Sequence, residues 1–542
     1  MSTSDIVKIA LEFAGGLGLF LYGMKLMSEN LEKAAGNKLK SLLSILTKNR
    51  FMAVIIGALF TMLIQSSSAT TVMVVGFINA GLMSLTQSVG VIMGANIGTT
   101  ITAQLVAFNL SKIAPAFLFI GVLLVFFANK KKITVVGASI AGFGMLFIGM
   151  SFMSSAMKPL QSLEGLQETV LKFENPVYGI LAGAVFTAVI QSSSASVGIM
   201  QAMASQGLIG LHGSVYIVLG QNIGTCITAI LACIRTTKNA KRAALIHLMF
   251  NVVGAIVFSV LLSFIPIADW IIKLSPNNAM RQIANFHVLF NISMTLLLFP
   301  FGNLLVAASR KMVKGEETEE EPQKLLFIDE RLFNMPGIAQ MQIQKEIMRM
   351  ARLTRENITD AVAAFTTGDD SLISGVYKKE QVIDYLNHEI TRYLVKANQS
   401  DITEEDKIVI GSFFHVVTDL ERIGDHAENI VEFAETRIDG SMVFSAEAIE
   451  ELQMISQRVF ELLDISCAIL ERRDRKTAKA TVAPLEQRID DMEKNLKQKH
   501  IDRLNSNLCA PRAGTIFIEI LSNLERVADH ATNIAYSVLQ DA

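Results

Sequence analysis

The chain is poor in the residues that crosslink, coordinate metals or react. Its four cysteines in 542 residues form neither a CxxC pair nor a metal-ligand spacing, so we expect free thiols and not disulfides or a zinc site. The sequence has no nucleophile–base constellation and no nucleotide-binding loop, so we do not expect an enzyme. Because no basic patch is interleaved with aromatic residues, nucleic acid is not an expected partner.

Acidic residues are missing from a long part of the first half. Between Phe51 and Leu163 there is no Asp or Glu, and the only charged residues are Lys112, Lys130, Lys131, Lys132 and Lys158. From Gly315 onward the sequence is charged and amphipathic. The mean hydropathy of +0.42 therefore averages a membrane part and a soluble part.

The apolar stretches are long enough to predict a polytopic membrane protein. A helix needs about 20 apolar residues to cross a bilayer. Expected spans are residues 6–27, 87–108, 113–128 (short), 133–155, 213–234, 243–265 and 283–308. The first of these contains Glu12 and Lys25 and no small-residue cleavage site, so we expect a retained helix and not a signal peptide.

The first part of the chain repeats itself after 126 residues. Gly16, Gly23 and Gly57 recur as Gly142, Gly149 and Gly183, and "GANIGTTITA" at residues 94–103 recurs as "GQNIGTCITA" at residues 220–229. The repeats cover about residues 6–130 and 132–308. Each contains three spans plus a segment that is too short to cross twice, which we interpret as a re-entrant hairpin. An odd number of crossings makes the second repeat inverted relative to the first.

The positive charges of the loops indicate the orientation. Lys33, Lys38, Lys40, Lys48 and Arg50, then Lys130 to Lys132, then Arg235, Lys238, Lys241 and Arg242, and finally Arg310 and Lys311, fall on one side. Cytoplasmic loops are enriched in Lys and Arg. We therefore expect a multi-pass protein of the plasma (inner) membrane whose C-terminal half is cytoplasmic.

A QSSS motif occupies both expected hairpins. Its residues are Gln65, Ser66, Ser67 and Ser68 in the first repeat and Gln191, Ser192, Ser193 and Ser194 in the second. Serine hydroxyls and N–H groups at the start of a helix suit an anion, and hydroxyl and carbonyl oxygens at a helix break suit Na⁺. The alternative is polar contact between membrane helices. Two copies in inverted repeats favour a binding site.

An NIGT motif follows each hairpin. Asn96 and Thr99, and their counterparts Asn222 and Thr225, offer side-chain oxygens, and glycines on either side weaken the helix. Interrupted segments at matching positions of two halves indicate a site near the midplane. The alternative is that the glycines only permit close packing of helices. Because no acid lies nearby, an anionic substrate could itself supply the charge that cations need.

Two helices carry a His–Asn pair at i, i+4 spacing, in "HLMFN" (residues 247–251) and "HVLFN" (residues 287–291). The spacing places both side chains on one face of the helix. We expect hydrogen bonding between helices in the core. The alternative is a role in gating or beside the site.

After a linker (residues 313–335) that contains the acidic run "EETEEEP", residues 336–542 predict two similar helical bundles in tandem, about 336–438 and 444–541. Each contains two ExxxD motifs, whose spacing puts two carboxylates on one helical face. The pairs are Glu380/Asp384, Glu421/Asp425, Glu486/Asp490 and Glu525/Asp529. Such pairs suit a divalent or transition metal; the alternative is a solvated acidic face.

Over about residues 6–308 the doubled QSSS, the GxNIGT segments and the HxxFN helices resemble the type II sodium–phosphate cotransporter family. The resemblance implies Na⁺-coupled uptake of inorganic phosphate, with the QSSS regions forming the substrate and ion site. Family members that move net charge have an aspartate near the first QSSS, which this chain lacks. This departure predicts an electroneutral cycle.

The C-terminal half resembles PhoU-like regulatory domains, which are tandem three-helix bundles whose ExxxD motifs can bind metal. The whole sequence thus predicts an all-α, polytopic membrane transporter of two inverted-topology repeats, with a cytoplasmic helical-bundle domain. Its predicted function is sodium-coupled phosphate symport by alternating access. Alternatives are a membrane-anchored phosphate sensor and a Na⁺ symporter of another anion. Expected partners are phosphate, the lipid bilayer, and either a second copy of the chain or a cytoplasmic regulatory protein.

Overall fold

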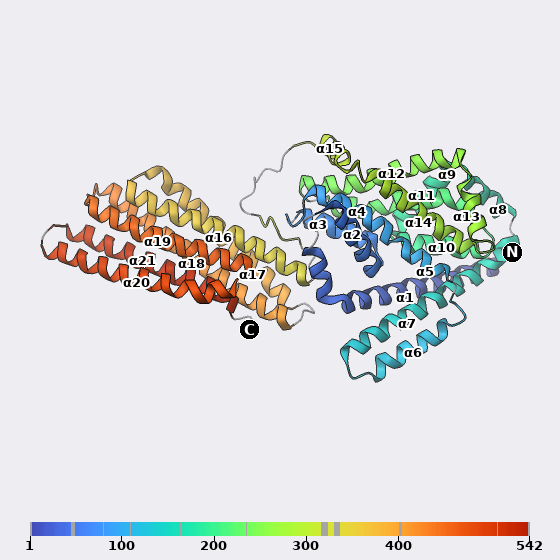
Figure 1. Cartoon of the computed structure of the whole chain (residues 1–542), viewed down its shortest axis with the longest axis horizontal. Coiled ribbons are helices and arrows are strands. Elements are labelled where there is room, and N and C mark those ends of the chain that lie inside the picture. Colours follow the sequence, from blue (N-terminus) through green and yellow to red (C-terminus); the bar gives the residue numbers. More distant parts are fainter. Residues whose placement is uncertain are drawn as a thin grey trace. The chain divides into compact units, whose positions relative to one another are not determined.

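The computed structural model describes residues 3–44, 49–79, 81–108, 110–162, 164–234, 236–315, 324–329, 336–399, 404–506 and 508–539. Over these residues the chain is helical and contains no β-strand (Figure 1). It divides into two compact units, Met1–Thr318 and Glu319–Ala542. Lys48, Arg235 and the acidic run at residues 316–322 lie outside the described residues.

The first unit is built of fifteen helices among its described residues. They are α1 (Thr3–Ser44), α2 (Arg50–Ile64), α3 (Ser67–Asn79), α4 (Leu85–Gly98), α5 (Thr100–Ala107), α6 (Ala114–Phe127), α7 (Lys131–Met157), α8 (Glu164–Leu171), α9 (Pro176–Ile190), α10 (Ser193–Ser205), α11 (Leu211–Ala232), α12 (Lys238–Phe264), α13 (Ile267–Leu274), α14 (Ala279–Leu298) and α15 (Gly302–Met312).

Five helical segments of the described chain are long and apolar enough to span a bilayer: Ser4–Ala34, Leu85–Ala107, Lys131–Gln161, Leu211–Ala232 and Lys238–Phe264. Helix α6, expected to be a short span, has 14 residues. The continuous span expected over residues 283–308 is wrong, because α14 and α15 meet at a bend of 83°. Pro300 lies in this bend and cannot donate the hydrogen bond that would continue α14.

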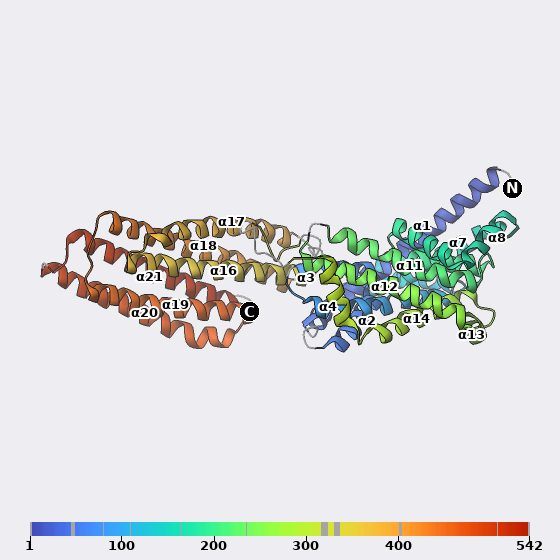
Figure 2. The same ribbon diagram turned by 90° about the horizontal axis from the view of Figure 1, so that it is seen from above.

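The first helices of the two repeats pack against each other in antiparallel fashion, side by side in Figures 1 and 2. A Cβ atom at Gly23 of α1 would lie 2.7 Å from the carbonyl oxygen of Gly142 in α7, and one at Gly16 would lie 3.0 Å from that of Gly149. Each glycine therefore contacts the repeat counterpart of the other. Antiparallel packing of equivalent helices is the arrangement that an inverted repeat produces.

Matching residues also fold the two hairpins. Asn49 caps α2 by accepting a hydrogen bond from the N–H of Phe51, and Asn175, 126 residues later, caps α9 in the same way with Val177. Helix α2 packs on α4, and α9 packs on α11, through backbone contacts at glycine. A Cβ at Gly94 would lie 2.1 Å from the Val54 oxygen, and a Cβ at Gly220 would lie 2.0 Å from the Ile180 oxygen, positions that only glycine tolerates.

The second unit is an elongated helical bundle in two halves. Its helices are α16 (Pro336–Thr367), α17 (Ile373–Asn398), α18 (Glu404–Asp439), α19 (Ala446–Arg472), α20 (Arg475–Asn505) and α21 (Pro511–Tyr536). Buried apolar side chains from all six helices form one continuous core, so the two three-helix halves are fused and do not stand apart.

Part of the expected linker belongs to this bundle. The buried carboxylate of Glu346 in α16 accepts hydrogen bonds from the backbone N–H groups of Leu326 (2.9 Å) and Phe327 (2.7 Å). Arg349, which is ion-paired to Glu346, donates to the carbonyl oxygen of Lys324. Residues 324–329 are therefore held on α16 by a charged pair.

Candidate functional site

The glutamine of each QSSS motif ends a helix in a left-handed conformation. Gln65 has φ 58° and ψ 23° after α2, and Gln191 has φ 58° and ψ 21° after α9. A residue with a side chain adopts this region at a cost of roughly 1 kcal/mol, and such strain concentrates at functional sites. Both copies have the same backbone geometry. The sharp turn is therefore a property of the QSSS motif itself and not of its surroundings in one repeat.

The three serines of each motif have different roles. The hydroxyls of Ser66 and Ser192 accept hydrogen bonds from the N–H groups of Ala69 (3.1 Å) and Ala195 (3.2 Å) and so cap α3 and α10. Ser67 is buried, and its hydroxyl has no partner among the residues that the structure describes. The first serine of each motif is therefore structural, and Ser67 in the first motif offers an unused hydroxyl at a helix N-terminus, where an anion is favoured.

Thr102 of α5 lies between the two motifs. Its hydroxyl donates a hydrogen bond of 2.7 Å to the side-chain oxygen of Gln65, and the hydroxyl of Ser194 approaches it to 3.5 Å. Thr102 is 1% exposed. Sequence reasoning missed this residue, although threonine recurs at the matching position of the second repeat, Thr228. The two motifs, far apart in the sequence, thus meet at one residue that belongs to neither.

The NIGT motifs differ between the repeats. Thr99 lies at the junction of α4 and α5, where it keeps helical dihedral angles and its N–H donates to the carbonyl oxygen of Ala95. Asn222 and Thr225 lie inside the continuous helix α11, so the interruption predicted there is wrong. The amide nitrogens of Asn96 and Asn222 donate to the carbonyl oxygens four residues earlier, at 3.1 and 2.9 Å. Each of these two side chains therefore still has its oxygen and one N–H group for a ligand.

Of the hydrogen bonding between helices expected for the two His–Asn pairs, the described residues show one bond, from Asn251 of α12 to Cys226 of α11. His247 and His287 are buried, yet neither ring nitrogen of His247 and not Nδ1 of His287 has a partner within the described chain. Asn251 and Asn291 donate instead to the backbone carbonyl oxygens of the histidines, and Asn251 also donates to Cys226. Each His–Asn pair is thus joined through the backbone carbonyl oxygen of the histidine. The three ring nitrogens named above have no hydrogen-bond partner among the described residues.

Buried acceptor oxygens accumulate in this unit. Oxygens that lack a hydrogen-bond donor in the described residues include Ser67 Oγ, Thr99 Oγ1, Gln201 Oε1, Gln221 Oε1, Asn251 Oδ1 and Asn291 Oδ1. Each unsatisfied buried group costs about 1–3 kcal/mol, so each of these oxygens needs a partner such as water, an ion or a ligand. Hard, neutral oxygens are the ligands that suit Na⁺, and hydroxyls also donate to phosphate oxygens.

The second unit gathers carboxylates at the predicted ExxxD motifs. In the first half, burial together with the charges of Asp384 and Asp425 raises the pKa of Glu380 to about 8. Burial and neighbouring carboxylates also raise the pKa values of Glu421 and Asp425. These carboxylates therefore repel one another, although among the described residues they do not form a group of three whose oxygens converge within 4.8 Å.

In the second half, three of the four predicted residues converge. Oxygens of Asp490, Glu525 and Asp529 lie within 4.8 Å of one another, and Oδ1 of Asp490 is buried without a described partner. Glu486 is not part of this group, although its pKa is raised by burial and by the charges of Asp529 and Asp490. The donor set of carboxylate oxygens fits a hard or transition cation.

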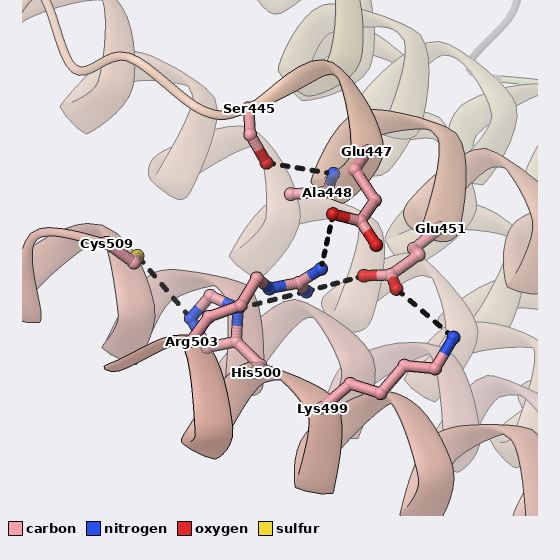
Figure 3. Close-up of polar contacts among 8 residues, drawn as sticks. All are labelled: Ser445, Glu447, Ala448, Glu451, Lys499, His500, Arg503 and Cys509. Carbon is pink, nitrogen blue, oxygen red and sulfur yellow. Dashed lines mark hydrogen bonds and ion pairs between the residues drawn. The ribbon is translucent and has the colours of Figure 1, made fainter. Parts of the chain in front are cut away.

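A second charged network, which no motif predicted, lies between α19 and α20 (Figure 3). Arg503 is ion-paired with Glu451 at 2.5 Å and with Glu447 at 3.6 Å, and it approaches Nδ1 of His500 to 3.3 Å. On its other side, the imidazole of His500 approaches the thiol of Cys509 (3.7 Å). Only tertiary contacts reveal this network, because its members are not spaced as a motif.

Two families of known proteins match the chain. The model of the Na⁺/Pi-cotransporter family matches twice, over residues 19–155 and 159–295, and the PhoU domain model also matches twice, over residues 347–434 and 452–538. The two PhoU matches fall within the two helical bundles expected at residues 336–438 and 444–541, whereas the first cotransporter match runs beyond residue 130 and the second begins at residue 159.

Three relatives illustrate the similarity. The "Putative inorganic phosphate export protein YjbB" of Salmonella typhimurium is 23% identical over 98% of this chain and 97% of its own length. The "Uncharacterized protein YqeW" of Bacillus subtilis is 35% identical over 55% of this chain and 95% of its own length. The "Sodium-dependent phosphate transport protein 2A" of Rattus norvegicus is 32% identical over 19% of this chain and 16% of its own length.

Proposed function

Because the chain belongs to the Na⁺/Pi-cotransporter family and carries PhoU-domain repeats, we propose that it moves inorganic phosphate across the cell membrane together with Na⁺. The observation that carries this proposal is the meeting of the two QSSS motifs at Thr102, which brings Gln65 and Ser194 to one place. A site shared by two inverted repeats is the arrangement found in transporters that work by alternating access.

In the proposed site, phosphate is held by the hydroxyls and helix N-termini that follow the two left-handed glutamines. Ser67 and Ser68 contribute from the first hairpin, and Ser193 and Ser194 from the second, while Gln65 and Gln191 add amide donors and oxygens. Na⁺ is held by neutral oxygens, for which Asn96, Thr99, Asn222 and Thr225 are the candidates. Since no carboxylate lies between residues 51 and 163, the negative charge in this part of the site is that of the substrate.

The proposed direction of transport is uptake, driven by a Na⁺ gradient directed inward. The Salmonella relative is named an export protein, so export is the second candidate. A coupled carrier runs in whichever direction the combined gradients of phosphate and Na⁺ favour, so uptake and export are both compatible with one mechanism. Reversing the Na⁺ gradient across a proteoliposome therefore distinguishes a symporter, which reverses its flux, from an exporter that Na⁺ does not drive.

The second unit is proposed to lie in the cytoplasm and to regulate transport. Glu380, Asp384, Glu421 and Asp425 would hold one divalent or transition metal ion, and Glu486, Asp490, Glu525 and Asp529 another. A bound cation would relieve the repulsion that raises the pKa of Glu380. The homodimer and the cytoplasmic regulatory partner stay predictions.

The experiment that tests the proposed function is uptake of radiolabelled phosphate into proteoliposomes with and without a Na⁺ gradient. We expect accumulation only with the gradient, and competition by arsenate more than by sulfate. Binding of phosphate without accumulation would favour a membrane-anchored sensor. Accumulation that sulfate or a carboxylate suppresses more strongly than phosphate would favour a symporter of another anion.

A further inference from the structure

One hydrogen bond of the site is not duplicated by the repeat. Thr102 donates to Gln65, and both are buried, at 1% and 6% exposed. Their counterparts are Thr228 and Gln191. Gln191 is exposed, and the hydroxyl of Thr228 donates instead to the carbonyl oxygen of Thr225 in its own helix, at 3.0 Å.

The rest of the two hairpins matches, so the difference does not come from the fold of the tips. The glutamine dihedral angles agree within a few degrees. Thr61 and Thr70 are hydrogen-bonded at 2.8 Å, and their counterparts Thr187 and Ser196 at 2.9 Å. What differs is how well each tip is covered.

The side chains of α2 and α9, the helices that lead to the two tips, differ in how exposed they are. Phe60 of α2 is 1% exposed and its counterpart Phe186 of α9 is 42% exposed. Leu63 is half-buried, whereas its counterpart Val189 is 77% exposed. The protein therefore covers the first tip more fully than the second, and in this sense we call the first tip closed.

The local sequences do not impose this asymmetry. The segments "GTTITA" at residues 98–103 and "GTCITA" at residues 224–229 differ at a single position, and both are helical, yet Thr102 donates to Gln65 of the hairpin whereas Thr228 donates within its own helix. One sequence pattern with two sets of hydrogen bonds is what an element with two low-energy states would show. In an inverted repeat, exchange of the two arrangements between the halves transfers access from one side of the membrane to the other.

From this difference we propose that Thr102 and Thr228 are positioning residues that act alternately. In the state described here, Thr102 holds Gln65 in the closed tip, and α5 is fastened to the second hairpin by Gln201, which donates to the carbonyl oxygen of Ala103 at 3.0 Å. In the state of opposite access, Thr228 holds Gln191 and Gln65 is released. This inference rests on the proposed transport function.

The test uses isosteric variants of the full-length protein in detergent and proteoliposomes. Thr102→Val keeps the shape of the side chain but removes the donor to Gln65, and Thr228→Val does the same in the other repeat. Thr102→Ser retains the hydroxyl and is the matched control. The state is read from the rate at which a water-soluble maleimide labels a cysteine placed at Leu63 or at Val189, in a background that lacks Cys467 and Cys509.

We expect Thr102→Val to speed labelling at position 63 and to slow it at position 189, each on the order of ten-fold, because an unsatisfied buried acceptor disfavours the present state. Thr228→Val should shift both rates in the opposite sense, and Thr102→Ser should behave like the unmodified chain. Rates that move in the same direction at both positions, or do not move in variants that remain monodisperse, would overturn the proposal. Labelling needs no phosphate flux, so failure of transport in the unmodified chain is a separate result.

Discussion

Thr102 donates a hydrogen bond of 2.7 Å to Gln65, and its hydroxyl lies 3.5 Å from that of Ser194 in the other repeat. One side chain of α5 therefore contacts both QSSS motifs. Because Gln65 and Ser194 belong to different repeats and both contact Thr102, the two hairpin tips lie at a common site. The predictions below follow from that site and from the acidic clusters of the second unit.

Replacing Ser67 by alanine should lower phosphate affinity without lowering the thermal stability of the protein. The Ser67 hydroxyl is buried without a described partner, so its loss removes an unsatisfied group and should leave the midpoint of thermal unfolding equal or slightly higher. Phosphate affinity should fall by about 10-fold, since one hydrogen bond to an anion is lost. Ser88→Ala is the control, because Ser88 is equally buried but donates to the carbonyl oxygen of Leu85. A Ser67→Ala protein that is less stable yet binds phosphate normally would contradict the assignment.

The cycle should carry no net charge. With no carboxylate between residues 51 and 163, the charge that moves is that of the cargo, and divalent phosphate with two Na⁺ ions sums to zero. We expect Na⁺-driven phosphate uptake to proceed without a current across the same proteoliposome membrane. A phosphate-dependent current under voltage clamp would show that the cycle is electrogenic.

Cation binding to the second unit should strengthen as the pH rises. The pKa of Glu380 is about 8 in the folded protein, against 4.5 for a free glutamate, so the native state retains a proton that the unfolded chain has lost. The free energy of unfolding therefore falls as the pH rises from 4.5 to about 8. A cation that displaces this proton should raise the unfolding temperature more at pH 8.5 than at pH 6, by roughly 2–4 °C.

Glu380→Gln should weaken both the loss of stability between pH 4.5 and about 8 and the stabilisation by a cation, because the neutral amide neither titrates nor repels its neighbours. Thermal unfolding of the full-length protein with and without Mn²⁺ measures this. Glu450→Gln, at an exposed position of α19, is the control. Equal Mn²⁺ stabilisation in Glu380→Gln and in the unmodified chain would exclude Glu380 as a ligand.

The network of Figure 3 should stabilise the second half of the bundle. The side chains of Arg503 and Glu451 are 14% and 7% exposed, so Arg503→Met leaves a nearly buried carboxylate with Lys499 as its remaining cation, at 3.7 Å, and should cost about 3 kcal/mol. Adding Glu451→Leu should recover part of that loss, because the nearly buried charge is then gone. Arg458→Ala breaks an exposed pair with Glu461 and should change stability by less than about 1 kcal/mol. A double variant no more stable than Arg503→Met would refute the pairing.

Much of the fold could be predicted because it depends on local composition and on the repeat. The apolar segments and the helical second half are properties of short windows of sequence, and the comparisons confirm the family. The span over residues 283–308 was misjudged because hydropathy averages over Pro300, whose backbone effect breaks the helix.

The site could be predicted only in part, because it is made by tertiary contacts. The QSSS serines are identical in sequence, yet one caps a helix and the next is unpaired. Thr102 gains its role from Gln65 and Ser194, which no periodicity places beside it. The segments after the two NIGT motifs show the limit most clearly, since Thr102 bonds to Gln65 whereas its counterpart Thr228 bonds within its own helix.

The central claim is that both hairpins hold the same phosphate, and a double-mutant cycle of Ser67 and Ser193 tests it most directly. Equilibrium binding of radiolabelled phosphate in Na⁺ would be measured for each alanine variant and for the double variant. If both hydroxyls contact one phosphate, the losses of binding free energy should be non-additive by more than about 0.5 kcal/mol. Strictly additive losses, or two independent binding sites of which each variant removes one, would contradict a shared site.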